Sequence, residues 1–167
     1  NTLNSSISAT YTFKTGDANS SPVEGIVVST SQEVLNAIAS ASPGEKIYVR
    51  GGDYIFDSTI NLDGSGSSGN VISLLAYPDE ATRPKFDFSS MAENSSNRGL
   101  QVNGAFWHIQ GIDVFGAGDN GMFIKGNNNL IEFCTFSENS DTGLQIGNGA
   151  SNNTILNCDS FYNADST

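Results

Sequence analysis

Basic residues are scarce in this sequence. Lysine and arginine number 7 among 167 residues, against 18 aspartates and glutamates, so the formal net charge is −11. Nucleic acids are bound by clustered lysine and arginine, and the seven basic residues here are scattered, so nucleic acid is excluded as the expected partner. An acidic polymer would need a divalent cation, held by aspartates, to supply positive charge. A plain solvated acidic surface is the alternative explanation.

Long apolar runs are also absent. No stretch of about 18 apolar residues occurs, so no segment is expected to span a membrane. The chain begins with Asn1 rather than Met and shows no signal peptide, as expected for a processed product. Its two cysteines, Cys134 and Cys158, do not amount to a disulfide framework.

Glycine, serine and asparagine are abundant instead. They gather in the runs GSGSSGN, GNNN and GNGASNN, and short clusters of Ile, Val, Leu and Phe lie between such runs. This alternation predicts one all-β domain with many short strands and tight turns. We expect residues 1–29 to form a lead-in, either poorly anchored or packed on the body as a strand. Residues 30–44 should form a helix, and residues 45–167 the strands.

The helix prediction depends on a capping box. Thr30 begins a T-x-x-E motif, in which its hydroxyl accepts from the backbone N–H of Glu33 while the Glu33 carboxylate reaches back. Pro43-Gly44 is expected to end the helix. An apolar stripe at helical spacing is expected from Val34, Leu35 and Ile38.

A repeat runs through the second half of the chain. Gly99-Leu-Gln-Val, Gly121-Met-Phe-Ile and Gly143-Leu-Gln-Ile begin 22 residues apart, from 99 to 121 and from 121 to 143. A second series with nearly the same step consists of Phe86, Ile109, Ile131 and Ile155. A third series consists of Ile112, Cys134 and Cys158.

This period predicts a β-solenoid of about 22 residues per coil. Equivalent residues then stack about 4.8 Å apart, and the inward ones form an apolar column. A leucine-rich repeat has a similar period, but its L-x-x-L-x-L-x-x-N frame is missing. The helix is expected to cover the open first coil. Nothing corresponds to it at Thr167, so we expect the coils to continue beyond that residue.

Two stretches carry a family resemblance. PGEKIYVRGGDYIF and GSGSSGNVISLLAYPDEATRPKFDFS resemble the opening coils of secreted polysaccharide lyases. The run from NRGLQVNGAFWHIQGIDVFGAGDNGMFIKG to NCDSFYNADST resembles the family 9 pectate lyases, so that the likeness covers residues 30–167. It implies a right-handed parallel β-helix that binds polygalacturonate in an outer groove. It also implies a secreted enzyme that uses calcium, held by aspartates, and a lysine base for β-elimination.

The resemblance also implies site residues. The NCDS motif places Asp159 at the first calcium-ligand aspartate of the family, and strand alternation from the inward Cys158 turns Asp159 outward. Asp165 is a weaker candidate ligand, because turns favour aspartate anyway. Asp113 shares the register of Asp159 and is a candidate substrate-binding residue, with a solvated side chain as the alternative. No residue of this chain matches the catalytic lysine, so the polypeptide alone is expected to be inactive.

Other functions remain open at this stage. An alginate or chondroitin lyase, an epimerase or a polygalacturonase would share the fold, and so would a non-enzymatic glycan-binding adhesin. Lys125 has no acidic neighbour in the pattern, and His108 is expected to be structural. Stacked thiols are favoured over a disulfide for Cys134 and Cys158. The asparagine-rich turns are expected to form side-chain ladders along the solenoid.

Overall fold

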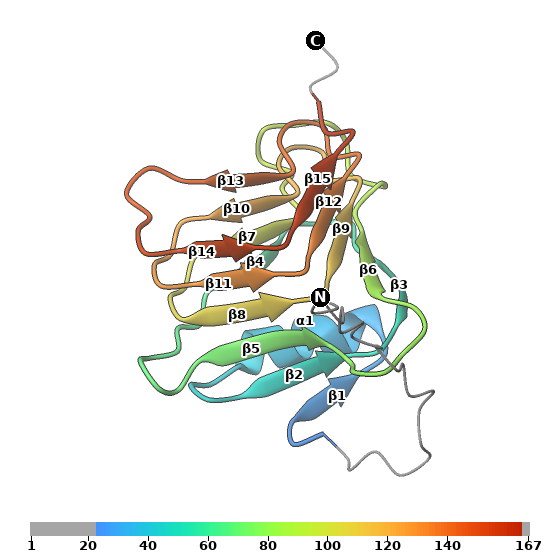
Figure 1. The fold of residues 1–167 in the computed structure, drawn as a ribbon. Coiled ribbons are helices and arrows are strands. Elements are labelled where there is room, and N and C mark those ends of the chain that lie inside the picture. Colours follow the sequence, from blue (N-terminus) through green and yellow to red (C-terminus); the bar gives the residue numbers. More distant parts are fainter. Residues whose placement is uncertain (1–22, 165–167) are drawn as a thin grey trace, which may run out of the picture.

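The structure, a computed structural model, describes residues 23–164. They wind into a parallel β-solenoid of about 6 turns with about 24 residues per turn, and one short helix lies near the N-terminus. Figure 1 shows the first coil at the bottom and the last at the top. The predicted fold class is confirmed, with a slightly longer mean period than the repeat indicated.

Three parallel sheets form the sides of the solenoid. Sheet A consists, along the axis, of β1 (Ile26–Val28), β2 (Lys46–Val49), β5 (Ile72–Ala76), β8 (Trp107–Gln110), β11 (Leu130–Glu132) and β14 (Thr154–Leu156). Sheet B consists of β3 (Gly52–Ile55), β6 (Pro84–Asp87), β9 (Asp113–Phe115), β12 (Thr135–Ser137) and β15 (Asp159–Phe161). Sheet C consists of β4 (Ile60–Leu62), β7 (Leu100–Val102), β10 (Met122–Ile124) and β13 (Leu144–Ile146).

The core consists of inward columns that run through successive coils. In sheet A one column holds Ile47, Leu74, Ile109 and Ile131, each fully buried. A single coil cannot bury its own inner face, so each apolar side chain depends on the coils above and below it. The stacking of coils is therefore the main source of stability, at about 25 cal/mol for each Å² of apolar surface removed from water.

The expected place of Phe86 in this column is wrong. Phe86 lies in sheet B, where it pairs in register with Val114, and Leu74 occupies the position below Ile109. The step from Leu74 to Ile109 is 35 residues, whereas the step from Ile109 to Ile131 is 22. The turns on either side of β6 are long in that coil. Counting back about 22 residues from Ile109 therefore reaches Phe86 in sheet B instead of Leu74 in sheet A.

The helix α1 spans Ser31–Ser40 and has the predicted capping box. Glu33 N donates to Thr30 Oγ1 at 3.2 Å, and Thr30 N donates to Glu33 Oε2 at 3.1 Å. The helix ends at Ser40, before the expected Pro43-Gly44. Leu35 is 37% exposed, contrary to expectation, because the buried stripe runs through 34, 37 and 38 and leaves residue 35 at its edge.

The helix packs against β1, β2 and β4, at the N-terminal end of the solenoid. β1 lies within the predicted lead-in and pairs with β2, which adds a strand at that end. The other expectations for the lead-in, which concern residues 1–22, lie outside the described residues. No helix within residues 23–164 is long and apolar enough to cross a membrane.

Asparagine side chains of adjacent coils form a ladder in the turn between sheets C and A, but they bind backbone groups rather than each other's side chains as predicted. Asn129 Oδ1 accepts from Trp107 N at 2.8 Å, and Asn153 Oδ1 accepts from Asn129 N at 3.0 Å. A second ladder, which the sequence did not reveal, joins Asn139 and Asn163 in the turn between sheets B and C. These amides satisfy backbone groups that the bent chain leaves without strand partners.

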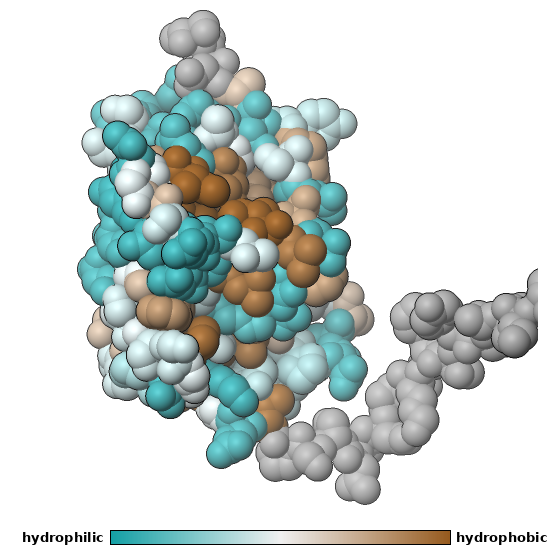
Figure 2. Space-filling view, turned by 60° about the vertical axis from the view of Figure 1, so that its left-hand side comes forward, coloured by the Kyte–Doolittle hydropathy of each residue, from teal (hydrophilic) through white to brown (hydrophobic). Residues whose placement is uncertain are grey.

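The last described coil is more exposed than those below it. Ile155 is in register with the fully buried Ile131 yet is 38% exposed, because no described strand lies above it. Ile146, the sheet C counterpart of the buried Ile124, is 49% exposed. Figure 2 shows hydrophobic side chains gathered on the upper half of the molecule, towards this coil.

Candidate functional site

The outer face of sheet B carries a column of charged and polar side chains. Strand alternation turns the residue before each buried one outward, and the parallel register stacks these outward residues coil on coil. The column runs in order through Asp53, Lys85, Asp113, Thr135 and Asp159. The structure confirms the predicted shared register of Asp113 and Asp159, with Thr135 between them.

Lys85 is held between two carboxylates in the lower part of this column. Its Nζ lies 3.1 Å from Asp53 Oδ1 and 3.5 Å from Asp87 Oδ2. The hydrogen bond to Asp53 raises the pKa of Lys85, with a further contribution from Asp87. Lys85 therefore stays protonated, which makes it unsuitable as a base at neutral pH. Its Nζ also lies 5.0 Å from the centroid of the Phe115 ring.

Asp113 is paired with Arg83. Arg83 Nη2 lies 2.8 Å from Asp113 Oδ1, but no described group donates a well-aligned hydrogen bond to that oxygen. Burial raises the pKa of Asp113, against the opposing effects of Arg83 and of a hydrogen bond with Thr135. The Asp113 carboxylate is thus half-buried and partly neutralised, rather than the solvated side chain considered above.

Asp159 lies in β15 with an exposed side chain, one coil above Thr135 and two above Asp113. The two carboxylates are therefore roughly 10 Å apart along the axis. Asp165 lies outside the described residues. Calcium takes 6–8 oxygen ligands, and residues 23–164 contain no group of three or more His, Cys, Asp or Glu that could hold a metal ion. The described residues thus do not fit calcium by themselves.

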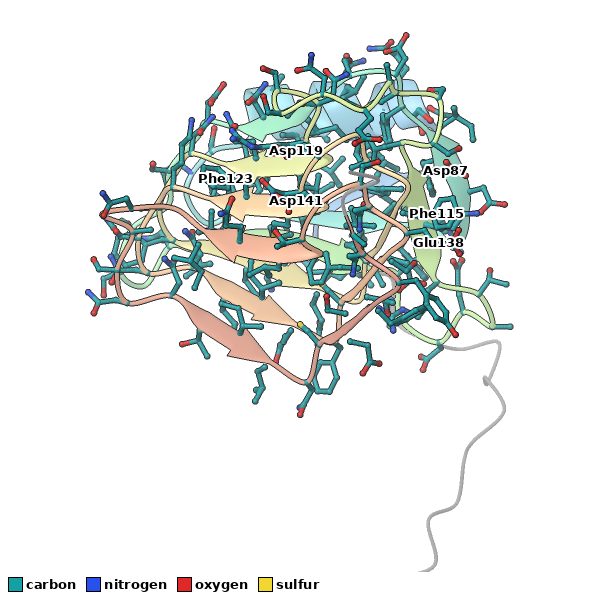
Figure 3. The ribbon with its side chains drawn as sticks, turned by 90° about the horizontal axis from the view of Figure 1, so that it is seen from above. Asp87, Phe115, Asp119, Phe123, Glu138 and Asp141 are labelled. Carbon is teal, nitrogen blue, oxygen red and sulfur yellow. The ribbon has the colours of Figure 1, made fainter. Side chains whose placement is uncertain are left out.

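The outer face of sheet C has a different character. Arg98 lies over the Phe123 ring, with its guanidinium carbon 4.0 Å from the centroid, and its Nε is 3.2 Å from Asp119 Oδ2. Lys125 Nζ is 5.7 Å from the same centroid. In Figure 3, Phe123 lies on one side of the solenoid, and Asp87, Phe115 and Glu138 lie on the other. Sequence reasoning missed the Arg98 contacts, because they cross more than 20 residues.

The outer face of sheet A carries the lone histidine. His108 Nε2 lies 2.8 Å from Glu132 Oε1, one coil above. Its neighbour Trp107 points inward, is fully buried, and donates from Nε1 to Gly64 O at 2.7 Å. Trp107 is therefore a core residue, and His108 joins two coils, which agrees with the structural role expected for it.

A hollow of about 370 Å³ lies at the corner where sheet A passes into sheet B. It is lined by Ala76, Tyr77, Pro78, Arg83, Gln110, Gly111 and Phe133. The hollow brings together residues from three successive coils. The sequence does not predict it, because the long turn at 77–83 supplies three of its seven lining residues, Tyr77, Pro78 and Arg83.

The two cysteines are free thiols on adjacent coils, as favoured from the sequence. Cys134 is buried, and Cys158 is half-buried. Both thiols donate to backbone carbonyls, Cys134 to Ile109 O at 3.8 Å and Cys158 to Ile131 O at 3.7 Å. The interaction with the neighbouring Cys134 thiol lowers the pKa of Cys158 to about 6. The interaction with Cys158, and then burial, raise the pKa of Cys134.

Comparison with known proteins gives a consistent family. The model of the Pel9A-like, right-handed β-helix region matches residues 11–167. Pectate lyase L of Paenibacillus polymyxa is 46% identical over 140 residues, which cover 77% of this chain and 31% of that protein. Pectate lyase L of Dickeya chrysanthemi is 33% identical over 171 residues, covering 98% of this chain and 40% of that protein.

A solved structure agrees with these relatives. The crystal structure of pectate lyase Pel9A superposes with a TM-score of 0.69 at 33% identity, over 78% of this chain and 34% of that one. The chain thus spans between 31% and 40% of the length of these three proteins.

Proposed function

Because the chain belongs to the family of Pel9A-like right-handed β-helix proteins, we propose that it is the N-terminal part of a secreted pectate lyase that cleaves polygalacturonate by calcium-assisted β-elimination. The relatives and the fold support a pectate lyase-like polysaccharide lyase. The observation that carries the proposal is the 46% identity to a pectate lyase over 140 residues, which cover 77% of this chain.

The outer face of sheet B is the proposed substrate side. It presents the outward column that contains Asp113 and Asp159, with Lys85 between acids and Arg83 beside Asp113. A carboxylate repels a uronate carboxylate but accepts hydrogen bonds from sugar hydroxyls, which is the role proposed for Asp113. Asp159 is exposed and contributes one oxygen to the proposed calcium site.

No catalytic step is assigned to the described residues. They contain no group of three or more His, Cys, Asp or Glu that could bind calcium, and Lys85 is kept protonated by its carboxylate partners. Lys125 has an aromatic ring rather than a carboxylate or a metal site beside its Nζ. The proposal therefore includes the expectation that this chain alone does not turn over substrate.

The experiment compares this chain with the product of the complete gene. Polygalacturonate, alginate and chondroitin sulfate are supplied separately, with calcium or with a chelator, and the unsaturated product is followed by ultraviolet absorbance. We expect calcium-dependent activity of the gene product on polygalacturonate and none from the chain alone. Activity on alginate alone would refute pectate as the substrate. Robust turnover by the chain alone would refute its proposed inactivity.

A matched pair of variants tests Asp159 in the gene product. Asp159→Asn should weaken calcium binding, measured by calorimetry, by about tenfold or more, because one charged oxygen ligand is lost. Asp53→Asn changes the same outward column at its lower end and should leave calcium affinity unchanged. Equal calcium affinity for Asp159→Asn and the unmodified protein would remove Asp159 from the site.

A further inference from the structure

The hollow at the corner between sheets A and B is lined by two aromatic residues, a cation and an amide. These are Tyr77, Phe133, Arg83 and Gln110. The Arg50 guanidinium lies over the Tyr77 ring, 4.1 Å from its centroid, so Phe133 is the aromatic residue with a ring available to a ligand. Its volume of about 370 Å³ lies in the range of small-molecule sites, which is about 300–1,000 Å³. The proposed function uses the outward column of sheet B, which meets this hollow at Arg83, and gives the other lining residues no role.

Phe133 is an unusual residue for its position. Its φ is +52°, and the residues at the same turn position in the adjacent coils are Gly111, with φ +74°, and Asn157, with φ +50°. Glycine and asparagine tolerate this left-handed conformation, whereas other residues lose about 1–2 kcal/mol. Phe133 as a whole residue is also 46% exposed, so it adds little to the core. Neither the turn nor the packing explains a phenylalanine here, which indicates a role at the surface.

Arg83 is anchored across two coils. Its Nε donates to Gly111 O at 3.3 Å, and its Nη2 donates to Phe133 O and pairs with Asp113. These contacts fix the guanidinium plane, while Nη1 donates to none of the residues that the structure describes. The side chain is 44% exposed, so a ligand oxygen can approach the guanidinium group from solvent. The charge of Arg83 is shared with one carboxylate, so we expect a weak site.

The geometry points to an accessory carbohydrate site, in which this hollow binds one hexuronate unit of an acidic polysaccharide. The choice of ligand class rests on the proposed function. An exposed ring next to a cation suits a sugar that carries both C–H faces and a carboxylate, since the ring packs on the C–H face and the guanidinium pairs with the carboxylate. Gln110 adds an amide for the sugar hydroxyls.

Trigalacturonate is the probe, and its fully methyl-esterified form is the neutral comparator. Binding to the chain is followed by amide chemical shifts in NMR. We expect trigalacturonate to move the amide signals of Gln110 and Gly111, with affinity at least tenfold higher than that of the methyl ester. Raising the salt concentration should weaken this binding, because a charge pair contributes to it.

Three variants test the roles of Phe133 and Arg83 in the hollow. Phe133→Asn removes the ring but suits the turn, since Asn157 occupies the same position one coil above. It should fold normally and weaken binding at least tenfold. Arg83→Gln should do the same, whereas Arg83→Lys should recover part of the affinity. Phe106→Asn, at another positive φ of +57° and between β7 and β8, is the control and should bind normally.

The outcomes separate this site from the proposed function. If trigalacturonate moves signals around Asp159 but not at Gln110 and Gly111, the accessory site is refuted and the pectate proposal stands. If a mannuronate trimer fills the hollow while trigalacturonate binds nowhere, the site stands and the pectate proposal falls. If both Phe133→Asn and Arg83→Gln bind as tightly as the unmodified chain, the hollow is not the site.

Discussion

Asn139 and Asn163 stack side chain on side chain, with Nδ2 of the first 2.8 Å from Oδ1 of the second, one coil above. Asn139 also accepts from Ala117 N at 3.0 Å, so one amide connects three successive coils. Asn139 is 1% exposed, and water cannot replace these contacts without opening the turn. The ladder thus stabilises the corner between sheets B and C.

Replacing Asn139 with alanine should lower the free energy of unfolding by about 1–3 kcal/mol, because the buried Ala117 N–H loses its acceptor. Urea unfolding followed by circular dichroism measures this change. Asn148→Ala, at an exposed turn position, is the control and should stay within about 0.5 kcal/mol of the unmodified chain. Equal losses in both variants would show that the ladder adds nothing specific.

Thr30→Ala should lower the free energy of unfolding by about 1 kcal/mol, because the helix loses the side-chain acceptor of its capping box. The double variant with Glu33→Ala should cost less than the sum of the two single changes, since both remove the same reciprocal pair. Gln32→Ala, on the exposed side of α1, is the control. Strictly additive losses at Thr30 and Glu33 would contradict the coupling.

Asp113→Asn should change how stability depends on pH. Burial raises the pKa of Asp113. A carboxyl with a higher pKa in the folded state than in the unfolded state loses folding stability as pH rises from its ordinary pKa, about 3.9, through the folded value. The variant lacks this loss, so its stability relative to the unmodified chain should improve as pH rises above about 4.

Urea unfolding at several pH values measures this difference. In Asp113→Asn, Arg83 loses its carboxylate partner, which lowers folding stability by the same amount at every pH in this range. It does not change how stability varies with pH, because arginine does not titrate there. A relative stability that falls with rising pH would show that Arg83 outweighs burial.

Alkylation with iodoacetamide should modify Cys158 in the folded chain and reach the buried Cys134 only after unfolding. The interaction with the neighbouring Cys134 thiol lowers the pKa of Cys158 to about 6, so its alkylation rate should rise as pH increases through that value. Cys134→Ala should slow the reaction at neutral pH by about tenfold, because less thiolate is present. Cys134→Ser keeps a donor and should react faster than Cys134→Ala. Identical rates in both variants would show that a donor at position 134 does not lower the pKa of Cys158.

The repeat was visible in the sequence because short-range rules create it. Gly99, Gly121 and Gly143 each precede a sheet C strand, and alternation within the strand decides which side chains face inward. The capping box at Thr30 is equally local. These features require no knowledge of turn length, so the solenoid, the helix and the outward register of Asp159 were predictable.

The features that the sequence did not reveal depend on turns. Phe86 was assigned to the wrong sheet because the coil from Leu74 to Ile109 is 35 residues long. The contact between Arg83 and Phe133 O joins residues that are 50 positions and two coils apart, so no local sequence pattern predicts it. Whether Asp159 binds calcium, and Asp113 substrate, stays a prediction, because the described residues do not complete either site.

That same 35-residue coil shows how the solenoid tolerates change. Ile109 sits directly over Leu74 although the turns between them hold many more residues than those of the next coil. The additional residues form a longer turn at a corner, after which the chain resumes the same parallel strand pairing. An insertion in a turn therefore lengthens that turn without displacing the buried side-chain columns. Insertions in the turns can therefore change the residues available for ligand contacts. An insertion of one residue within a strand is not tolerated in the same way, because it would turn the buried side chains of that strand to water.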